Sequence, residues 1–439
     1  MKVVIIGNGI AGITTARHLR KLNSELEILV ISGESEYFYS RPALMYIFMG
    51  HMKFEHTKAY EDWFWEKNRI DLKQAWVKSI DFQEKQLNCA DGSVVSYDKL
   101  VLATGSKTAT YDWPGQELQG VQGLIGLQDL DLLEKNVQGV KKAVIIGGGL
   151  IGVELAEMLH SRGIDVEILV RENRFWGSVL PPQEGKLIER HLHDHGVRVQ
   201  SNTELAEIIG EGGKVIGIRT TSGEIKDCEL VCIATGVRPN VDFLKGSTLE
   251  IERGILVDEF LKTNVEDVFA AGDCMEFRKP IEGRGKFEQM WHSGRMMGEH
   301  LAQTVLGSDK AYAPGVWYNA AKFFDVEYQA YGRLSNEPVS SFYWEHPKAK
   351  ICLRMEHKDQ RLVAMHAFGM RLRHQVADGW IRDEKSLEYC LSHFKDLVFN
   401  PEFHRDHSRA IALEFRRQFG VEVKLEKKSW KRILNAFAS

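Results

Sequence analysis

Two stretches of the chain share one pattern of hydrophobic and polar positions. Each begins with a short β-branched run, KVVIIG (2–7) or KAVIIG (142–147), which leads into a glycine-rich turn. Apolar residues at helical spacing follow, and a second apolar run closes each stretch (LEILVIS and VEILV). Short apolar runs predict buried strands, and the spaced apolar positions predict a helix. Each stretch therefore predicts a strand–helix–strand unit, and the pair predicts an α/β protein.

Three further patterns fill the rest of the chain. DWFWEKNRIDL (62–72) belongs to a stretch that we expect to be helical, and a second helix is expected near 293–306. Short alternating runs over 77–106 predict a small antiparallel ribbon around the Asp91–Gly92 turn. From residue 313 the chain turns to aromatic-rich, strand-like runs and a polar tail with helical spacing. We predict a separate domain there.

The two turns carry matching glycine motifs, GNGIAG (7–12) and GGGLIG (147–152). In this context the first glycine permits the tight turn, the second lets the backbone approach a pyrophosphate, and the third allows close helix–strand packing. The start of the following helix faces the phosphates. The expected dinucleotide-binding residues are Gly7, Gly9, Ile10, Ala11 and Gly12 in the first unit, and Gly147, Gly149, Leu150, Ile151 and Gly152 in the second.

The position that reads the ribose follows each motif by about 20 residues, at the end of the second strand. In the first unit this region holds Glu34, and an acidic residue suits a free 2′-hydroxyl such as that of FAD. In the second unit it holds Arg171 and Glu172, with Arg174 following. Arginine suits the 2′-phosphate of NADPH, whereas Glu172 is also compatible with NADH. The sequence therefore favours NADPH over NADH only slightly.

Composition and charge exclude few functions. Hydrophobic content is 44%, net charge is −4 and the pI is near 6.5, which gives no reason to expect nucleic-acid binding. No window approaches the roughly 18 apolar residues of a membrane span, and the N-terminus lacks the pattern of a secretory signal. Six scattered cysteines favour buried structural thiols over a redox pair. We expect a cytoplasmic protein.

Three more segments join the glycine motifs: YDKLVLATGS (97–106), VCIATGVRPN (231–240) and TNVEDVFAAGDC (263–274). Together they resemble the motifs of the pyridine nucleotide-disulfide oxidoreductase superfamily, over about residues 1–310. The resemblance implies two Rossmann-like dinucleotide-binding domains, with an FAD domain (1–112 and 243–312) split by an inserted NAD(P)H domain (113–242). A C-terminal α+β interface domain (313–439), ending in a helical tail, completes the expected fold.

The resemblance also implies roles for particular residues. Asp273, after Gly272, would hydrogen-bond the ribityl or phosphate region of FAD, and Val77 would line the adenine site. Ala103, Thr104 and Gly105 would form the turn on the FAD side, and Gly236 would lie beside the nicotinamide nucleotide. Glu154 is expected in the first turn of its helix, facing the nicotinamide; simple helix-dipole chemistry explains a glutamate there as well.

Members of this superfamily often carry a redox-active cysteine just past the first unit, but here that segment reads YSRPAL (39–44). It resembles the branch that contains rubredoxin and ferredoxin reductases, monodehydroascorbate reductase and apoptosis-inducing-factor-like proteins. By that resemblance Arg41 would contact the FAD pyrophosphate, and Pro42 suits the first position of a helix. Arg41 as a solvated surface charge is the alternative. Met45 and Tyr46 depart from the serine and lysine common in the branch. WFWEKNRIDL (63–72) and DKLVLATGS (98–106) also resemble the flavin module of assimilatory nitrite reductase.

Some aromatic and histidine residues allow two interpretations. Trp291 and Trp317 are candidates to approach the flavin edge, although core packing explains aromatic residues more often. His191 and His195 share one helix face, but Gly196 then ends the helix, so we predict a solvated helix end and no metal.

The tail KLEKKSWKRILNAFAS (424–439) carries five basic residues and one acid, with Trp430, Ile433, Leu434 and Phe437 in one apolar stripe. Three partners stay open for it: its own domain, an acidic electron carrier, or an anionic membrane surface.

The sequence therefore predicts an oxidoreductase in which NAD(P)H reduces FAD and no protein disulfide relays the electrons. The acceptor is then external: a rubredoxin- or ferredoxin-like carrier first, a small quinone or dioxygen next. A type II NADH:quinone oxidoreductase and an FAD-binding redox sensor with little turnover are the alternatives, and a homodimer stays open.

Overall fold

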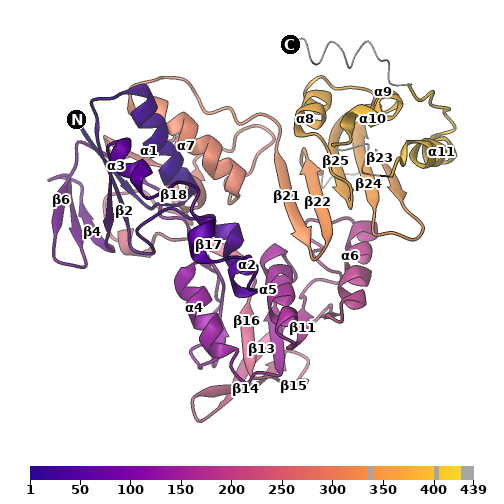
Figure 1. Cartoon of the computed structure of the whole chain (residues 1–439), viewed down its shortest axis with the longest axis horizontal. Helices are drawn as coiled ribbons and strands as arrows, with labels where there is room; N and C mark the ends of the chain where they lie inside the picture. The colour runs from indigo at the N-terminus through magenta and orange to yellow at the C-terminus, as the bar shows by residue number, and fades with distance from the viewer. Residues whose placement is uncertain (335–339, 400–404, 427–439) are drawn as a thin grey trace. The chain divides into compact units, whose positions relative to one another are not determined.

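The computed structural model describes residues 1–334, 340–399 and 405–426. The chain divides into two compact units, Met1–Pro314 and Gly315–Ser439 (Figure 1). The basic amphipathic stripe predicted for the tail, at residues 430–437, lies outside the described residues. None of the helices in the described ranges is long and apolar enough to cross a membrane.

The first sheet of the larger unit is parallel and has five strands, in the order β19-β7-β1-β2-β3. In chain order these are β1 (Lys2–Ile6), β2 (Glu27–Ser32), β3 (Ile70–Gln74), β7 (Lys99–Leu102) and β19 (Val268–Ala270). The chain leaves this sheet after β7 and returns to it only with β19. The first sheet is thus assembled from two separate parts of the chain.

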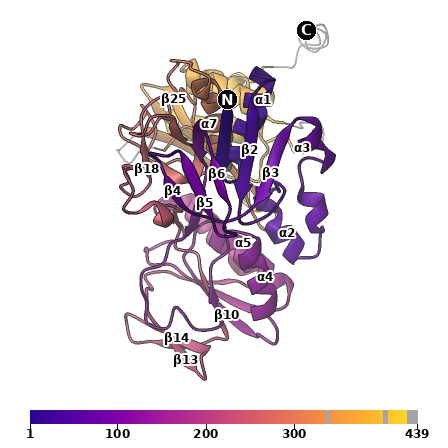
Figure 2. The same ribbon diagram turned by 90° about the vertical axis from the view of Figure 1, so that its left-hand side faces the viewer.

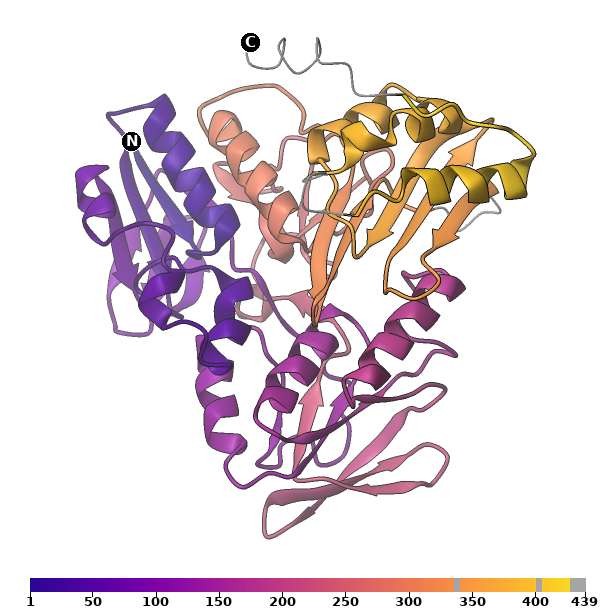
Figure 3. The same ribbon diagram turned by 45° about the vertical axis from the view of Figure 1, so that its right-hand side comes forward.

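Two long helices lie side by side on the first sheet (Figures 1 and 3). They are α1 (Ile10–Leu22) and α7 (Trp291–Val305). Short elements between β2 and β3 are a 3₁₀ turn (Arg41–Ala43), α2 (Leu44–Phe48), a second 3₁₀ turn (Phe54–Thr57) and α3 (Trp63–Lys67). The helix expected near 293–306 is confirmed as α7.

The stretch 62–72 is only partly helical, so the prediction for it was wrong in its second half. α3 ends at Lys67, and Ile70–Gln74 is strand β3 at the edge of the first sheet. Between them Arg69 has a φ of +52°. The Arg20 guanidinium donates to the carbonyl oxygens of Asn68 (2.8 Å) and Arg69 (2.6 Å). These tertiary bonds hold a chain reversal that helical spacing alone does not reveal.

The alternating runs over 77–96 form the predicted antiparallel ribbon, which Figure 2 shows in front of the first sheet. The prediction was wrong for residues 97–106, because Lys99–Leu102 is strand β7 of the parallel sheet. The strands of the ribbon are β4 (Val77–Asp81), β5 (Gln86–Cys89) and β6 (Val94–Ser96). Gly92, in the turn between β5 and β6, has a φ of +83°, a left-handed conformation that glycine adopts without strain. The prediction of a turn at Asp91–Gly92 is confirmed.

A second parallel sheet of five strands repeats the first, in the order β12-β11-β10-β16-β9. Its strands are β9 (Val121–Gln122), β10 (Lys142–Ile146), β11 (Asp165–Leu169), β12 (Arg198–Gln200) and β16 (Leu230–Ile233). Its helices are α4 (Leu127–Asn136), α5 (Leu150–Ser161) and α6 (Pro182–Asp194). An antiparallel sheet lies beside it, made of β13 (Leu205–Glu211), β14 (Lys214–Thr220) and β15 (Ile225–Asp227).

Two linkers join the first and second sheets and run antiparallel to each other. They are β8 (Ser106–Thr108) and β17 (Val237–Pro239). After β17 come 3₁₀ turns at Asp242–Leu244 and Gly272–Cys274 and the parallel pair β18 (Ile255–Val257) and β20 (Met275–Phe277). Because the linkers pair, the chain enters and leaves the second sheet at the same place.

The smaller unit is an antiparallel sheet covered on one face by helices (Figure 3). The strand order is β21-β22-β25-β24-β23, formed by β21 (Tyr318–Phe323), β22 (Val326–Tyr331), β23 (Ser340–Glu345), β24 (Cys352–Lys358) and β25 (Arg361–Phe368). The helices are α8 (His374–Arg382), α9 (Leu387–Ser392), α10 (Phe394–Leu397) and α11 (Ser408–Phe419). Alternate strand residues such as Leu353 and Met355 pack with these helices. The predicted fold class, two Rossmann-like domains plus an α+β domain, is confirmed.

Gly298 sets how closely α7 approaches α1. A Cβ built on Gly298 would lie 2.6 Å from the carbonyl oxygen of Ala11 and 2.9 Å from Cβ of Thr14. We therefore expect Gly298→Ala to lower the free energy of unfolding by about 1–3 kcal/mol, because two packed helices must separate. Denaturant unfolding followed by tryptophan fluorescence measures this.

Gly379→Ala in α8 is the matched control, since a Cβ there meets no atom of the described residues within 4 Å. It should be neutral or stabilise the protein by about 0.5–1 kcal/mol, because glycine is a poor helix former. Equal effects of the two substitutions would contradict the packing argument.

Candidate functional site

The first glycine turn joins β1 to α1 and leaves one side open. Gly7 has a φ of +110°, and a Cβ on it would lie 2.1 Å from the carbonyl oxygen of Ala103. A Cβ on Gly12 would lie 2.0 Å from the carbonyl oxygen of Gly7. Over Gly9, by contrast, no atom of the described chain comes within 4 Å. Gly7 and Gly12 are required by packing, while Gly9 leaves space at the start of α1, where Ile10 and Ala11 are the first residues. This turn fits a dinucleotide pyrophosphate.

The second turn, between β10 and α5, repeats these contacts closely. Gly147 has a φ of +112° and would place a Cβ 2.4 Å from the carbonyl oxygen of Ala234; for Gly152 the carbonyl oxygen of Gly147 is 2.2 Å away. Leu150 and Ile151 begin α5. The nearest atom to a Cβ on Gly149 is Nε1 of Trp176, at 4.0 Å. Trp176 was not predicted as a site residue; its only signal is an aromatic pair, FW (175–176), shortly after the second unit's last strand.

Each glycine turn faces an Ala–Thr–Gly turn at the end of a neighbouring strand. Ala103, Thr104 and Gly105 follow β7, and Gly236, with a φ of +109°, ends the corresponding turn after β16. The Thr104 hydroxyl donates to the carbonyl oxygen of Asn240 at 2.8 Å, and the Thr235 hydroxyl donates to that of Ala109 at 2.9 Å. Each threonine ties its turn to the linker strand that runs the other way.

Asp273 lies beside the first turn, just past β19. Gly272 has a φ of +78°, and a Cβ on it would lie 3.0 Å from Cβ of Ala11 at the start of α1. The Ser106 hydroxyl donates to the Asp273 carboxylate at 2.9 Å. Burial raises the pKa of Asp273, while Ser106 and the Arg41 charge oppose that shift. Hydroxyl donors from a ligand would lower the cost of keeping this carboxylate charged.

Glu34 and Arg41, predicted to contact different parts of FAD, contact each other. Nη2 of Arg41 donates to Oε2 of Glu34 at 2.7 Å and Nη1 donates to Oε1 at 3.0 Å. The Tyr39 hydroxyl and the backbone N–H of Leu127 (3.0 Å) also donate to Oε1. Arg41 donates as well to the carbonyl oxygen of Ile125. This cluster joins the loop after β2 to the start of α4; the predicted ribose and pyrophosphate contacts of the two residues stay predictions.

The neighbouring predicted residues have clear local roles. Pro42 stands in the first turn of the 3₁₀ helix Arg41–Ala43, where its missing N–H costs nothing. Val77 is the first residue of β4 and is partly buried against the core of the first sheet. The ring of Trp76 lies directly on Gly33, since a Cβ there would overlap it at 2.1 Å. Gly33 thus brings the β4 ribbon against the end of β2.

The region predicted to read the ribose in the second unit is exposed. Arg171, two residues past β11, has 71% of its side chain accessible, and its guanidinium lies 3.7 Å from the carboxylate of Glu172. Arg174 is held by the loop, because its Nη2 donates to the carbonyl oxygen of Gly177 at 2.8 Å. Arg171 is therefore the better placed of the two arginines to meet a 2′-phosphate.

Glu154 was predicted in the first turn of α5 but lies just past it. α5 begins at Leu150, so Glu154 is its fifth residue, and the first turn of α5 contains no acidic residue. The helix dipole acts mainly within the first turn, so it accounts for Glu154 poorly. The role facing the nicotinamide stays a prediction.

The two predicted tryptophans, Trp291 and Trp317, belong to different units of the chain. Trp291 is the first residue of α7 and is 40% exposed; its ring meets that of His292 edge-on. Trp317 belongs to the smaller unit, where the Arg333 guanidinium lies 5.7 Å from its ring centre. Their approach to a flavin stays a prediction.

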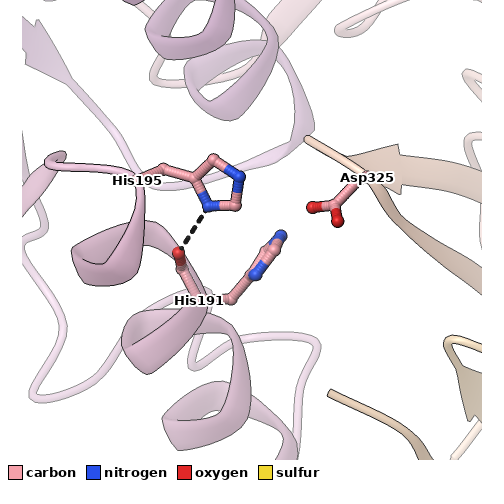
Figure 4. Close-up of side chains that lie close together, drawn as sticks. All are labelled: His191, His195 and Asp325. Atoms are coloured by element: carbon pink, nitrogen blue, oxygen red, sulfur yellow. Dashed lines mark hydrogen bonds between the residues drawn. The ribbon is translucent and has the colours of Figure 1, made fainter. Parts of the chain in front are cut away.

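His191 and His195 lie near the end of α6, where Nδ1 of His195 is 3.0 Å from the carbonyl oxygen of His191 (Figure 4). Because a carbonyl only accepts, this Nδ1 carries the proton. Gly196 follows with a φ of +78°, so the predicted helix end is confirmed. The prediction that this end is solvated was wrong for His191, whose side chain is buried.

All six cysteines fall within the described ranges, and all are free and buried. Burial raises the pKa of Cys228 and of Cys232 to about 12, so both thiols stay protonated near neutral pH. A protonated, buried thiol is a poor nucleophile. The interpretation of this pair as structural agrees with the geometry.

The Glu34–Arg41 pair generates a stability prediction. Burial alone would raise the pKa of Glu34, but Arg41, Tyr39 and the Leu127 N–H hold it below its ordinary value. Arg41→Ala should lower the free energy of unfolding at pH 7 by about 1–3 kcal/mol, less than for a fully buried pair because 41% of the Arg41 side chain is exposed.

The pH dependence of this effect has a definite sign. A carboxylate with a lowered folded pKa stabilises the protein above its unfolded pKa of about 4.3 and loses that contribution as the pH falls through the folded value. The difference between wild type and Arg41→Ala should therefore shrink below about pH 4. Lys73→Ala, which breaks an exposed pair with Asp91, should cost at most about 1 kcal/mol. An Arg41→Ala effect as small as this control would contradict the prediction.

Comparison with known proteins agrees with this geometry. The model of the pyridine nucleotide-disulphide oxidoreductase family matches residues 1–298. The chain is 31% identical over 341 residues to an NADH oxidase of Methanocaldococcus jannaschii (74% of this chain, 75% of the relative). It is 27% identical over 387 residues to the rubredoxin-NAD(+) reductase of Pseudomonas putida (87% and 99%). A ferredoxin reductase structure from Rhodopseudomonas palustris aligns with a TM-score of 0.78 at 25% identity (84% and 91%). The two glycine turns and this family match together place the chain in the pyridine nucleotide-disulphide oxidoreductase family, as an FAD-dependent NAD(P)H oxidoreductase.

Proposed function

We propose that this protein passes electrons from NAD(P)H through FAD to a small external electron carrier of the rubredoxin or ferredoxin kind. The observation that carries the proposal is the segment 39–44, which holds Arg41 where many family members hold a redox cysteine, together with six cysteines that are all buried. Without an accessible thiol, the acceptor must reach the flavin itself. Relatives named as rubredoxin and ferredoxin reductases support this choice of carrier.

The cofactors divide between the two glycine turns in this proposal. FAD would be held by Gly7, Gly9, Gly12 and Asp273 in domain segments 1–112 and 243–312, and NAD(P)H by Gly147, Gly149, Gly152 and Gly236 in segment 113–242. A bound flavin would supply the redox chemistry, namely hydride acceptance from nicotinamide and electron release to a carrier. The chain would bind and orient the cofactors: the glycines Gly9 and Gly149, which lack a Cβ, would admit phosphate close to the backbone, and Asp273 would accept hydrogen bonds from ligand hydroxyls.

Anaerobic reduction of the FAD-loaded protein tests this proposal. We expect NADH or NADPH to bleach the oxidised flavin absorption band rapidly, and added rubredoxin or ferredoxin to restore it without dioxygen. A quinone in the same assay is the control for the alternative acceptor. Failure of both nicotinamide nucleotides to bleach the flavin would favour a sensor. Bleaching that only quinone or dioxygen reverses would refute the carrier.

Arg171 generates a prediction about nucleotide preference. Because its exposed guanidinium can pair with a 2′-phosphate whereas Arg174 is held by Gly177, Arg171→Ala should weaken NADPH binding about tenfold and change NADH binding little. Titration calorimetry with NADP⁺ and NAD⁺, which carry the same 2′ groups and do not reduce the flavin, gives the two constants. Arg219→Ala, on β14 and paired with Glu207 at 2.6 Å, is the matched control. Equal losses for both nucleotides would contradict the assignment.

A further inference from the structure

The two glycine turns differ in what stands over the second glycine. Over Gly9 the described chain leaves open space, whereas Gly149 has Nε1 of Trp176 at 4.0 Å from the position of its missing Cβ. The other contacts of the two turns match within a few tenths of an ångström. The indole therefore belongs to one nucleotide turn and not to the other.

The loop that carries Trp176 is held from both sides. Phe175 is fully buried, and its ring lies 3.2 Å from the position of a Cβ on Gly148. Its backbone N–H donates to the carboxylate of Glu189, in α6, at 2.7 Å. The N–H groups of Val179 and Leu180 both donate to the carbonyl oxygen of Trp176 at 2.9 Å. These contacts fix the loop against the turn.

Trp176 itself has a strained backbone. Its φ is +46°, in the left-handed region that residues other than glycine, asparagine and aspartate adopt at a cost. Arg174 supports this conformation by donating to the carbonyl oxygen of Gly177 at 2.8 Å. Strain that the surroundings maintain is found often at ligand-binding sites, where it places one side chain accurately.

We propose that Trp176 is a binding residue for the nicotinamide nucleotide, and that its indole Nε1–H donates a hydrogen bond to the nucleotide's pyrophosphate at the Gly147–Gly152 turn. This inference rests on the proposed function, in which that turn binds NAD(P)H. Indole nitrogen is a donor only, so it suits an anionic oxygen. It adds a side-chain donor to the backbone N–H groups at the start of α5, which already favour negative charge.

This arrangement gives the second turn an additional hydrogen-bond donor for a bound pyrophosphate. An indole donor over Gly149 would add a charge-assisted hydrogen bond at a position where no described side chain stands over Gly9. The loss of that bond should therefore weaken ligands at the second turn and leave FAD at the first turn unaffected. This difference separates a binding role from a general effect on folding.

Calorimetric titration of the FAD-loaded protein with ADP-ribose, which contains the pyrophosphate without the nicotinamide, tests the inference. Trp176→Phe keeps an aromatic ring but removes the donor, and we expect about tenfold weaker binding of ADP-ribose with unchanged FAD content. Trp176→Gly relieves the positive φ and should weaken binding at least as much. Trp63→Phe, 58% exposed on α3, is the matched control and should bind as wild type does.

The outcomes separate two failures. If the wild-type protein binds neither ADP-ribose nor NAD(P)H, the proposed function fails. If wild type binds and Trp176→Phe binds equally well, only the role of Trp176 fails. Tighter binding by Trp176→Gly would show that the indole obstructs the site and would also overturn the inference.

Discussion

The architecture of the larger unit depends on one backbone contact made twice. At the end of each central strand a glycine lies against a carbonyl oxygen of the neighbouring strand's turn, at Gly7 and Ala103 in the first sheet and at Gly147 and Ala234 in the second. A Cβ at either glycine would come within 2.4 Å of that oxygen, and both glycines have left-handed backbones. Because the strand, the turn and the helix converge there, the contact aims each helix start at the same place relative to its sheet.

The two parallel sheets are connected through a pair of linkers that hydrogen-bond each other and the turns on both sides. The linkers β8 and β17 pair with each other, and Thr104 and Thr235 each hydrogen-bond the opposite linker. Arginines make further contacts across the larger unit. Arg41 reaches the carbonyl oxygen of Ile125, and Arg162 lies over the ring of Phe48 at 4.5 Å. The segment after β2, which contains no cysteine, is thus anchored by arginine to α4 and α5.

Much of this organisation can be predicted from the sequence, because it depends on local chemistry. Two glycine motifs, each between an apolar run and a helical pattern, predict the two nucleotide units, and the Asp91–Gly92 turn predicts the ribbon. Contacts between residues distant in sequence are harder to predict. The strand Ile70–Gln74 was hidden behind a helical pattern because Arg20, distant in sequence, holds the reversal at Asn68 and Arg69. Glu154 was expected in the first turn of α5, but the helix begins at Leu150 and so Glu154 lies just past that turn.

The sequence by itself determined the class of chemistry, because dinucleotide turns need glycine at set spacings and a thiol relay needs cysteine at one segment. Only the tertiary structure decided which side chains meet. Glu34 and Arg41, seven residues apart in an irregular loop, were expected only to contact a ligand, and the structure shows in addition that they bind each other. The sequence did not predict Trp176 as a site residue, yet the folded loop brings its indole over Gly149. Spacing along a chain fixes backbone geometry within one element, whereas contacts between loops depend on how several elements pack at once.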